Sequence, residues 1–552
     1  MNTIVFHPES DPNAVRDAAA ILRRGGLLGI PTETVYGLGA DALNEDAVSR
    51  IFLAKGRPQD NPLIIHVPDA SWLERYCRDV PPAAYQLAER FWPGPLTMIL
   101  PRRDIVPLQT TGGLETVGVR CPNHPVTLAI IEAAGVPIAA PSGNTSGRPS
   151  PTTAAHMIED MDGRIDGIVD GGPCTVGVES TIIDLTVTPP RLLRPGGLPL
   201  EDLERLIGRL PLESLRQVLG EVAVDKAVTG LLAAGERPRA PGMKYRHYAP
   251  HAPVTVVTGE PERSARRIQG LLSDTAGVIC FDEYAPLFPG HIIHKLGPAA
   301  DKSAQARHVF DALRTFDGTD VTEIFAQCPD DGGLGLAVAN RLKKAAGFHL
   351  IDADRPLIVG LTGGTGAGKT SALAALEDLG GTVLDCDAVY HQMLRTDPAL
   401  REAITAAFGP VFCPDGSLDR QKLGTLVFSD HAALDRLNAI VYEYLPPELL
   451  RRAQGHTLVG LDAISLMESG LGRLCACTVA VLAPAEDRVR RIMARDGISE
   501  DYARLRISAQ QPDAFYRERC SHILENNCAT PAQFREQARI FFRSMLREIE
   551  HL

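Results

Sequence analysis

Residues 357–370 read LIVGLTGGTGAGKT, an apolar run followed at once by a glycine-rich stretch that ends in Lys369 and Thr370. The second half matches the pattern G-x-x-x-x-G-K-T, in which glycines let backbone amides turn toward phosphate oxygens. A strand before the loop and a helix after it would place the positive helix end beside the phosphates. The stretch therefore predicts a nucleotide-binding α/β domain with a parallel sheet, beginning near residue 356.

Lys369 and Thr370 have separate expected roles at this loop. The lysine would reach the β- and γ-phosphates of a nucleoside triphosphate, and the Thr370 hydroxyl would bind a magnesium ion. Two carboxylates, Asp385 and Asp387, follow the next strand-like run, residues 382–384, and project to one side. They would hold magnesium or accept a proton from a substrate hydroxyl, unless they only cap a turn or a helix.

A pair of arginines lies further along the same part of the chain. Arg491 and Arg495 stand four residues apart and therefore share one helix face. They form either a lid that closes on phosphate or a solvated basic edge.

A second, unrelated signature stands near the N-terminus, at residues 55–66 with the sequence KGRPQDNPLIIH. A predicted helix ends at Gly56, so Lys55 and Arg57 would either meet a phosphate or complement the helix C-terminus. His66 lies on a strand face where a histidine is more often structural than a ligand. Because one ATP site does not need both signatures, the simplest interpretation is two enzymes on one polypeptide.

Three later segments carry polar residues that suit a carboxylate or phosphate ligand. In residues 116–120 (TVGVR), strand alternation puts Arg120 on the same face as Gly118, where the arginine would clamp a carboxylate or form a salt bridge. Residues 140–147 (APSGNTSG) make a simple turn or cradle a phosphate with amides and hydroxyls. Residues 179–184 (ESTIID) complete the set.

In this order and spacing, the N-terminal segments resemble the threonylcarbamoyl-AMP synthase family, which has the YrdC-type fold. The resemblance covers residues 22–197, while residues 241–250 (PGMKYRHYAP) and 334–342 (LGLAVANRL) resemble the longer, two-domain version of the family. It implies a twisted α/β sheet domain followed by a small Rossmann-like αβ domain. The implied reaction converts L-threonine, bicarbonate and ATP to threonylcarbamoyl-AMP and pyrophosphate, and the product serves proteins that modify tRNA.

The same resemblance implies the site residues of this half. Threonine would lie among Thr34, His66, Arg120, Ala140 and Ser180. ATP would be held by Arg57, Asn61, Thr116, Ser142, Ser150 and Arg194, with Lys55 beside the phosphates and Tyr248 closing over the nucleotide. Catalysis would come from positioning and from neutralisation of phosphate charge by Lys55, Arg57, Arg194 and magnesium, without a serine or cysteine nucleophile.

The segment from residue 357 onward resembles dephospho-CoA kinase, which phosphorylates the ribose 3′-hydroxyl of dephospho-CoA with ATP. The resemblance implies that the ATP loop comprises Gly366, Ala367, Gly368, Lys369, Thr370 and Ser371, that Asp387 is the catalytic carboxylate, and that Arg491 and Arg495 belong to the lid. Three places depart from the family pattern, namely Tyr442-Glu443, Ile464-Ser465 and Cys520-Ser521. The acceptor site is therefore either divergent but working or made for another nucleoside-like acceptor.

Length and composition fit a soluble enzyme with several domains. A chain of 552 residues is too long for one hydrophobic core, and the predicted parts are residues 1–200 (synthase domain), 201–253 (ordered linker), 254–350 (small αβ domain) and 356–552 (kinase-like domain). The net charge of −12 argues against a broad nucleic-acid surface. No apolar stretch is long enough to span a bilayer. The eleven scattered cysteines are typical of reduced thiols, so we expect a cytoplasmic protein.

Three functional hypotheses follow from these observations. The first is a bifunctional synthase and kinase, in which both halves use ATP and magnesium. The second keeps the synthase and treats the C-terminal domain as an ATP-dependent regulatory module. The third is an RNA-binding protein, supported only by the basic residues Arg237, Arg239, Lys244, Arg246, His247 and His251. The acidic balance and the lack of an aromatic stacking platform argue against the third.

Overall fold

The computed structural model describes residues 2–207, 222–229, 238–241, 248–415, 417–428 and 430–551. Contacts within the chain divide it into two compact units. The first unit comprises Met1–Pro261 with Asp274–Ile351, and the second comprises Glu262–Ser273 with Asp352–Leu552. Much of the linker expected over residues 201–253 lies outside the described residues, as do Arg237, Lys244, Arg246 and His247.

Within the described residues, the first unit contains an eleven-stranded mixed sheet in the order β1-β8-β2-β3-β7-β4-β6-β5-β9-β10-β11. Its strands are β1 (Ile4–Phe6), β2 (Leu28–Ile30), β3 (Gly37–Asp41), β4 (Ile64–His66), β5 (Leu96–Pro101), β6 (Thr116–Arg120), β7 (Ile138–Ala139), β8 (Gly167–Val169), β9 (Thr181–Asp184), β10 (Arg191–Arg194) and β11 (Ala223–Val224). The accompanying helices are α1 (Ala14–Arg23), α2 (Glu45–Lys55), α3 (Leu73–Tyr76), α4 (Pro82–Phe91), α5 (Pro125–Ala134), α6 (Ala154–Met161), α7 (Leu200–Ile207) and α8 (Lys226–Thr229).

The bounds of α2 follow from local signals at both ends. Asn44 caps the start, because its side chain accepts hydrogen bonds from the backbone N–H groups of Asp46 and Ala47. The helix ends at Lys55 because Gly56 adopts a left-handed conformation with φ of 61°. The end of α2 therefore places Lys55 at the edge of the sheet, next to the loops that carry polar residues.

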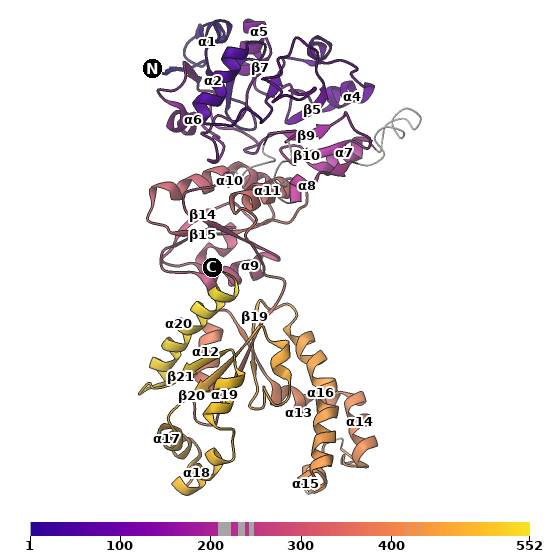
Figure 1. The fold of residues 1–552 in the computed structure, drawn as a ribbon, viewed down its shortest axis with the longest axis vertical. Helices are drawn as coiled ribbons and strands as arrows, with labels where there is room; N and C mark the ends of the chain where they lie inside the picture. Colours follow the sequence, from indigo (N-terminus) through magenta and orange to yellow (C-terminus); the bar gives the residue numbers. More distant parts are fainter. Residues whose placement is uncertain are drawn as a thin grey trace. The chain divides into compact units, whose positions relative to one another are not determined.

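A smaller parallel sheet follows in the same unit, and we call it, with α10 and α11, the small domain. The sheet has the order β14-β13-β15-β12-β16. Its elements are β12 (Val254–Thr258), β13 (Ala276–Cys280), β14 (Ile292–Lys295), α10 (Lys302–Thr315), β15 (Glu323–Gln327), α11 (Gly335–Ala345) and β16 (Leu350–Asp352). Figure 1 shows α10 and α11 together on one face of this sheet. The helix between β12 and β13, α9 (Pro261–Leu271), groups almost entirely with the second unit.

The second unit is built on a parallel sheet in the order β18-β19-β17-β20-β21, as the loop motif predicted. Its strands are β17 (Leu357–Thr362), β18 (Thr382–Asp385), β19 (Leu458–Asp462), β20 (Cys477–Leu482) and β21 (His522–Glu525). The helices are α12 (Lys369–Asp378), α13 (Cys386–Thr396), α14 (Pro398–Phe408), α15 (Arg420–Phe428), α16 (His431–Ala453), α17 (Ala485–Asp496), α18 (Glu500–Ser508), α19 (Asp513–Arg519) and α20 (Pro531–Ile549). Helix α12 packs against α20 (Figure 1).

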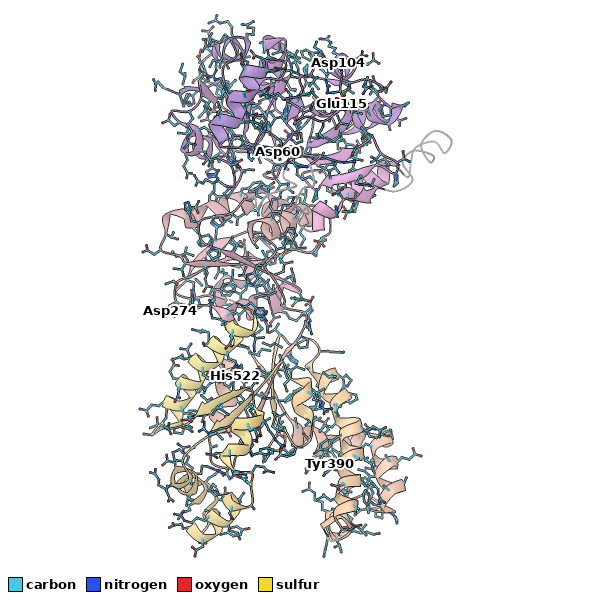
Figure 2. The ribbon with its side chains drawn as sticks, viewed as in Figure 1. Asp60, Asp104, Glu115, Asp274, Tyr390 and His522 are labelled. Atoms are coloured by element: carbon cyan, nitrogen blue, oxygen red, sulfur yellow. The ribbon has the colours of Figure 1, made fainter. Side chains whose placement is uncertain are left out.

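The surface and the cysteines match an ordinary globular enzyme. Charged side chains such as Asp104 and Glu115 project outward and pair with the buried guanidinium of Arg102 (Figure 2). None of the eleven cysteines forms a disulfide in the part of the chain that the structure describes, and most are buried. Among the described helices, none combines the length and apolar character that crossing a bilayer requires.

Candidate active sites

The first unit contains a pocket between the end of α2, the loops after β7 and β8, and the start of the segment that precedes the small domain. Ten residues predicted for the synthase site line this pocket: Lys55, Arg57, Asn61, His66, Arg120, Ala140, Ser142, Ser180, Arg194 and Tyr248. The structure thus gathers side chains that are spread over almost two hundred residues of sequence.

Lys55 and Arg57 form the basic part of the pocket. The Lys55 side chain is buried, and its Nζ donates hydrogen bonds to the backbone carbonyls of Ser142 and Asn144. Burial and the neighbouring Arg57 hold the pKa of Lys55 well below its ordinary value. Burial likewise lowers the pKa of Arg57 to about 10. Gly56 does cap α2, but the lysine reaches across to another loop instead of its own helix end.

His66 and Arg120 lie side by side because β4 and β6 pair in parallel with these two residues in register. The Arg120 Nη2 forms an ion pair with Glu33 Oε2 at 2.8 Å, and its Nε donates to the Gly94 carbonyl at 3.3 Å. The salt bridge expected as an alternative role is therefore present, and its partner Glu33 is buried outside the pocket lining. Burial and the adjacent Arg120 lower the pKa of His66 to about 3, so the imidazole is neutral at physiological pH.

Ser180 and Arg194 close the side of the pocket formed by β9 and β10. Arg194 donates from Nε to the Ser180 carbonyl and from Nη2 to the Ser180 hydroxyl, both at 3.1 Å. The hydroxyl also hydrogen-bonds Thr97 Oγ1 at 2.8 Å. Burial lowers the pKa of Arg194 to about 10. These contacts hold the Arg194 guanidinium against Ser180 in the pocket wall.

Three predicted residues are absent from the pocket lining. Thr34 is buried next to the lining residue Val35 and hydrogen-bonds the Thr32 hydroxyl at 2.8 Å. Thr116 stands at the far end of β6 from Arg120. Ser150 is buried behind the wall. Their contacts with a substrate stay predictions.

One pocket residue without an assigned role in the sequence analysis is Glu179. Ser150 donates to Glu179 Oε1 at 2.7 Å, and Arg341 Nε donates to Oε2 at 2.9 Å. Burial alone would raise the pKa of this carboxyl, but Arg341 and Arg194 hold it at about 2. The only sequence signal was an acidic residue at the start of the apolar ESTIID run. Glu179 and Arg341 lie more than 150 residues apart in the sequence, so their salt bridge produces no periodic pattern that sequence analysis could detect.

We expect His66 to make the stability of this unit depend on pH. The unfolded chain binds a proton on His66 below about 6.5, whereas the folded chain does so only near 3, so stability falls as the pH drops below 6.5. The slope attributable to this group is about 1.4 kcal/mol per pH unit. Replacing His66→Gln should remove that slope, measured between pH 5 and 7 by hydrogen exchange of amides in β4 and β6.

The control for this experiment is His7→Gln, which changes an exposed histidine of the same unit. It should leave the pH dependence of exchange as in the wild type. An unchanged slope in His66→Gln would contradict the neutral, buried state of His66.

The second unit carries its own pocket around residues 363–371. The lining includes Gly366, Gly368, Lys369, Thr370 and Ser371 of the predicted loop, together with Arg491, Arg495, Arg506 and Asn526. Lys369 Nζ donates to Asp462 Oδ1 at 2.7 Å, at the end of β19. Ala367, the remaining residue of the predicted loop, is buried.

Side chains from distant segments hold the shape of this loop. Gln510 accepts from Thr365 N–H at 2.9 Å and donates to the Thr365 hydroxyl at 2.6 Å. Asn526 donates to the Ala367 carbonyl at 2.8 Å, and Arg491 donates to the carbonyls of Gly366 and Ala367. Arg491 therefore contacts the loop backbone directly.

Arg495 and Arg506 share one carboxylate at the other side of the pocket. Arg495 Nε and Arg506 Nη1 both donate to Asp496, each at 2.6 Å. Arg506 was not predicted, because it lies on α18 and no spacing rule links it to the pair on α17. Three arginines thus line the pocket around residues 363–371, which we call the phosphate pocket after the sequence motif of its loop.

Asp385 and Asp387 stand outside the lining of this pocket. Asp385 Oδ1 accepts from Ala388 N–H at 3.0 Å and so caps α13, which was one of the open interpretations. In the sheet register Asp385 lies opposite Asp462, the partner of Lys369. Asp387 is exposed in the first turn of α13. Their catalytic and metal roles stay predictions.

The three departures in sequence have different structural settings. Ile464 lines the phosphate pocket, and its carbonyl accepts from the Thr362 hydroxyl at 2.8 Å. Tyr442 interacts with Ser465, the residue after Ile464. Ser521 instead accepts from Thr478 N–H at 2.7 Å and ties β21 to β20. Of the three residues, only Ile464 lines the pocket around residues 363–371.

We expect Gly368→Ala to eliminate nucleotide binding by the second unit. Gly368 has φ of 111°, and an added Cβ would lie 2.4 Å from Asn526 Nδ2. The loop must open or Asn526 must move, which destroys the amide cradle. Equilibrium binding of an ATP analogue measures the loss. Gly455→Ala is the control, because its positive φ is similar but its Cβ would meet no atom within 4 Å. Retained binding in Gly368→Ala would contradict this role of the loop.

Comparison with known proteins identifies a family for each part of the chain. Family models match residues 20–196 ("telomere recombination"), 210–347 ("threonylcarbamoyl-AMP synthase, C-terminal domain") and 357–532 ("dephospho-CoA kinase"). The threonylcarbamoyl-AMP synthase of Pyrococcus abyssi is 49% identical over 343 residues, which is 61% of this chain and 95% of that protein. The dephospho-CoA kinase of Moorella thermoacetica is 38% identical over 175 residues, which is 30% of this chain and 82% of that protein.

A solved structure gives the same result for the first unit. The crystal structure of P. abyssi Sua5 complexed with L-threonine aligns with a TM-score of 0.58 and 46% identity, covering 64% of this chain and 99% of that one. The chain is therefore an enzyme of the threonylcarbamoyl-AMP synthase family that also carries, in its C-terminal part, a domain of the dephospho-CoA kinase family.

Proposed function

We propose that the protein makes threonylcarbamoyl-AMP and pyrophosphate from L-threonine, bicarbonate and ATP, and that it separately phosphorylates the 3′-hydroxyl of dephospho-CoA. The observation that carries this proposal is the presence of two pockets, one in each unit, each lined by a lysine and arginines suited to phosphate. The two reactions are not consecutive steps, so each pocket works on its own substrate.

In the synthase pocket, Lys55, Arg57 and Arg194 would surround the triphosphate. The carbamate formed from threonine and bicarbonate attacks the α-phosphorus through an oxygen, and the bond to the β-phosphate breaks so that pyrophosphate leaves. Cations held in place before the reaction stabilise the charge that develops on the phosphate oxygens. The buried hydrogen bonds of Lys55 and Arg194 supply that fixed arrangement.

Threonine would bind at the β4–β6 end of the pocket. Arg120 would meet its carboxylate, and the neutral His66, Ala140 and Ser180 would shape the space around its side chain and amine. Thr34 would contribute from behind Val35. The threonine complex of the P. abyssi relative supports a threonine site in this family. Asn61, Thr116, Ser142 and Ser150 would serve the nucleotide.

The carbamate intermediate is unstable in water and needs a dry site. Pro241 and Tyr248 line the pocket, and Tyr248 is buried. These two residues of the linker would therefore cover the nucleotide and exclude water during the reaction.

In the second unit, residues 366–371 would bind ATP, and Lys369 would reach the β- and γ-phosphates. Arg491, Arg495 and Arg506 would neutralise the transferred phosphate, while Asp387 would accept the proton of the acceptor hydroxyl. The Thr370 hydroxyl and the carboxylates of Asp385 and Asp462, which end neighbouring strands, are oxygen donors that fit a magnesium ion. Magnesium bound there would neutralise charge on the β- and γ-phosphate oxygens.

A second candidate function has a specific observation in its favour. Ile464 and Ser465 replace residues typical of the kinase family, and both line a cavity with Glu468, Gln510 and Tyr516 beside the phosphate loop. An ATP-binding module with a changed acceptor would have such a site. For RNA binding, two of the basic residues are in ion pairs: Arg239 with Asp184 at 3.2 Å and His251 with Asp317 at 3.3 Å.

One experiment on the full-length protein separates these functions. The protein is incubated with ATP, threonine and bicarbonate, and then separately with ATP and dephospho-CoA, and all products are identified by mass. Threonylcarbamoyl-AMP in the first mixture and CoA in the second are the expected results. ATP binding without CoA would favour the altered acceptor, and absence of threonylcarbamoyl-AMP would refute the synthase proposal for this pocket. The product is expected to pass to tRNA-modification proteins in the cytoplasm.

A further inference from the structure

Two buried arginines of the small domain hold the walls of the synthase pocket, although neither lines it. Arg341 on α11 is fully buried, and Arg314 on α10 is 6% exposed. Each one bonds to a different loop of the preceding sheet domain. A buried guanidinium has lost its bound water, so protein groups must accept the hydrogen bonds that its N–H groups donate.

Arg341 fixes the wall that contains Glu179. Its Nε donates to Glu179 Oε2 at 2.9 Å, and its Nη1 donates to the Pro195 carbonyl at 2.5 Å. Glu179 and Arg194, the neighbour of Pro195, both line the pocket. One guanidinium thus joins the strand end that carries Ser180 to the strand end that carries Arg194.

The same guanidinium lies 5.9 Å from the centre of the Tyr248 ring. Tyr248 has φ of 66°, which is unfavourable for a residue with a side chain. Its ring packs against Phe310 of the small domain, with centroids 5.1 Å apart. The small domain therefore holds the pocket residue Tyr248 in a conformation that the backbone alone disfavours.

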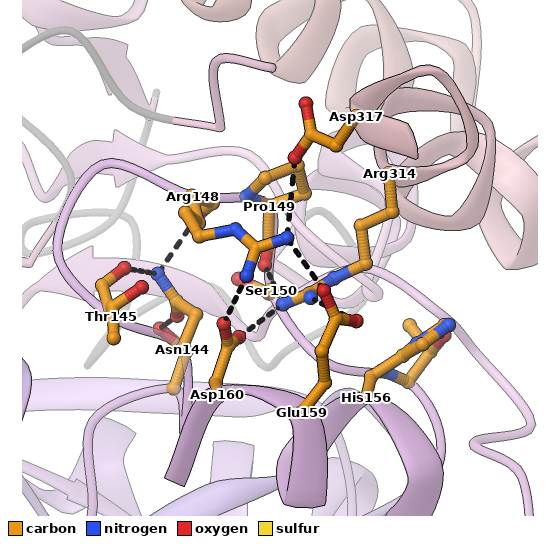
Figure 3. A network of polar contacts seen from close by, with 12 residues as sticks. Asn144, Thr145, Arg148, Pro149, Ser150, His156, Glu159, Asp160, Arg314 and Asp317 are labelled. Atoms are coloured by element: carbon orange, nitrogen blue, oxygen red, sulfur yellow. Dashed lines mark hydrogen bonds and ion pairs between the residues drawn. The ribbon is translucent and has the colours of Figure 1, made fainter. Parts of the chain in front are cut away.

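Arg314 bonds to the loop that follows Asn144, a residue in another part of the pocket wall (Figure 3). Its Nη2 donates to the Pro149 carbonyl and to Asp160 Oδ2, each at 2.5 Å. Asp160 also accepts from Arg148 Nη1 at 2.8 Å, and the Arg148 carbonyl accepts from Asn144 Nδ2 at 2.8 Å. A continuous set of hydrogen bonds therefore runs from α10 to the loop that binds Lys55.

Buried ion pairs of this kind add little net stability, because desolvation offsets their attraction. Their placement behind two loops of one pocket needs another explanation. We propose that Arg314 and Arg341 are positioning residues of the synthase reaction, each setting the geometry of one wall of the nucleotide pocket. The inference rests on the function proposed for that pocket, and it makes the small domain part of the active site.

The pH dependence of activity tests the pair of Arg341 and Glu179, because a purely structural role of Arg341 would leave that dependence unchanged. Glu179 is faced by Arg341 and Lys344 from α11, Arg194 from β10, Lys55 from α2, and by Ser150 and Tyr248. With Arg341 removed, the carboxyl stays buried and loses the strongest of the charges that lower its pKa, so its pKa should rise from about 2.

The test uses full-length Arg341→Met and measures pyrophosphate release against ATP concentration from pH 5 to 9. We expect kcat/KM for ATP to fall on the order of 10²-fold at pH 8, where misplacement of the wall dominates. Activity should also decline further toward acidic pH as Glu179 takes up a proton. In the double variant Arg341→Met with Glu179→Gln, that acidic decline should disappear.

The loop that carries Ser142 and Asn144 is tested with Arg314→Met in the same assay. Loss of its bonds to Pro149 and Asp160 should loosen the loop around Ser142 and raise KM for ATP roughly tenfold. An unchanged KM would overturn the role of Arg314.

Lys343→Met is the matched control, because Lys343 lies on α11 and pairs with Asp331 at 3.7 Å, outside the pocket. It should behave as the wild type. If wild type releases pyrophosphate but Arg341→Met matches it, or loses activity without the new acidic decline, the inference is refuted. If Arg341→Met does not fold, Arg341→Lys keeps the charge, and it should lower kcat/KM without an acidic decline. A wild type without activity would refute the proposed function instead.

Discussion

Replacing Arg57 with alanine should abolish pyrophosphate release from ATP, threonine and bicarbonate, with a loss of about 10³-fold in kcat/KM. Arg57 lines the synthase pocket beside Lys55, and burial lowers its pKa to about 10, so it stays charged at neutral pH. Its removal leaves the developing charge on the phosphate without one fixed cation. Release of pyrophosphate, followed with a coupled assay, measures the effect.

Two controls separate this loss from a loss of fold. Arg90→Ala removes an exposed arginine of α4 and should leave the synthase rate unchanged. Phosphorylation of dephospho-CoA by Arg57→Ala should also match the wild type, because that pocket belongs to the other unit. Undiminished pyrophosphate release would remove Arg57 from the site.

Local signals predicted the end of α2, whereas most residues of this pocket were predicted from the resemblance to the synthase family. The Asn44 cap and the left-handed Gly56 determine where α2 ends, and both are sequence-local effects. The parallel sheets were predictable because apolar strands alternate with helices at regular intervals. The fold class was accordingly confirmed, together with the family of each half.

Contacts between distant segments were not predictable from the same signals. Glu179 and Arg341 are 162 residues apart, and each taken alone has the sequence pattern of a charged surface residue. Burial of both depends on how α11 packs against the end of β9, which no periodicity reports. Arg314 and Asp160 are a second pair of this kind. The small domain therefore looked separate in sequence, although it holds the pocket walls.

In the domain of the kinase family, too, the sequence alone did not show which substitutions lie next to a pocket. Ser521 stands out as a departure from the family pattern, yet its hydroxyl serves strand pairing with Thr478. Ile464 is another of the three departures, and it lines the phosphate pocket. Motif comparison gives these substitutions equal weight. Only their positions in the fold show which of them lines a pocket.

Lys369→Ala should end phosphoryl transfer to dephospho-CoA, with a loss of about 10³-fold or more. Lys369 lines the phosphate pocket at the start of α12, and its Nζ forms an ion pair with Asp462 Oδ1 at 2.7 Å. In the complex, the same ammonium would leave Asp462 for the β- and γ-phosphates. Alanine removes that cation and leaves Asp462 without its partner, so both phosphate contact and local charge balance are lost. CoA formation, quantified by mass, measures the effect.

The control for a lysine-to-alanine change in the same unit is Lys422→Ala, since Lys422 is exposed and bonds to the Pro410 carbonyl at 2.6 Å. Its CoA formation should equal that of the wild type, and the synthase rate should be unchanged in both variants. If Lys369→Ala also slowed the synthase, the two pockets would not be independent, and the proposal of two separate activities would need revision. If it formed CoA at the wild-type rate, phosphoryl transfer would not use this loop. Only selective loss of CoA formation fits two active sites that work separately on one chain.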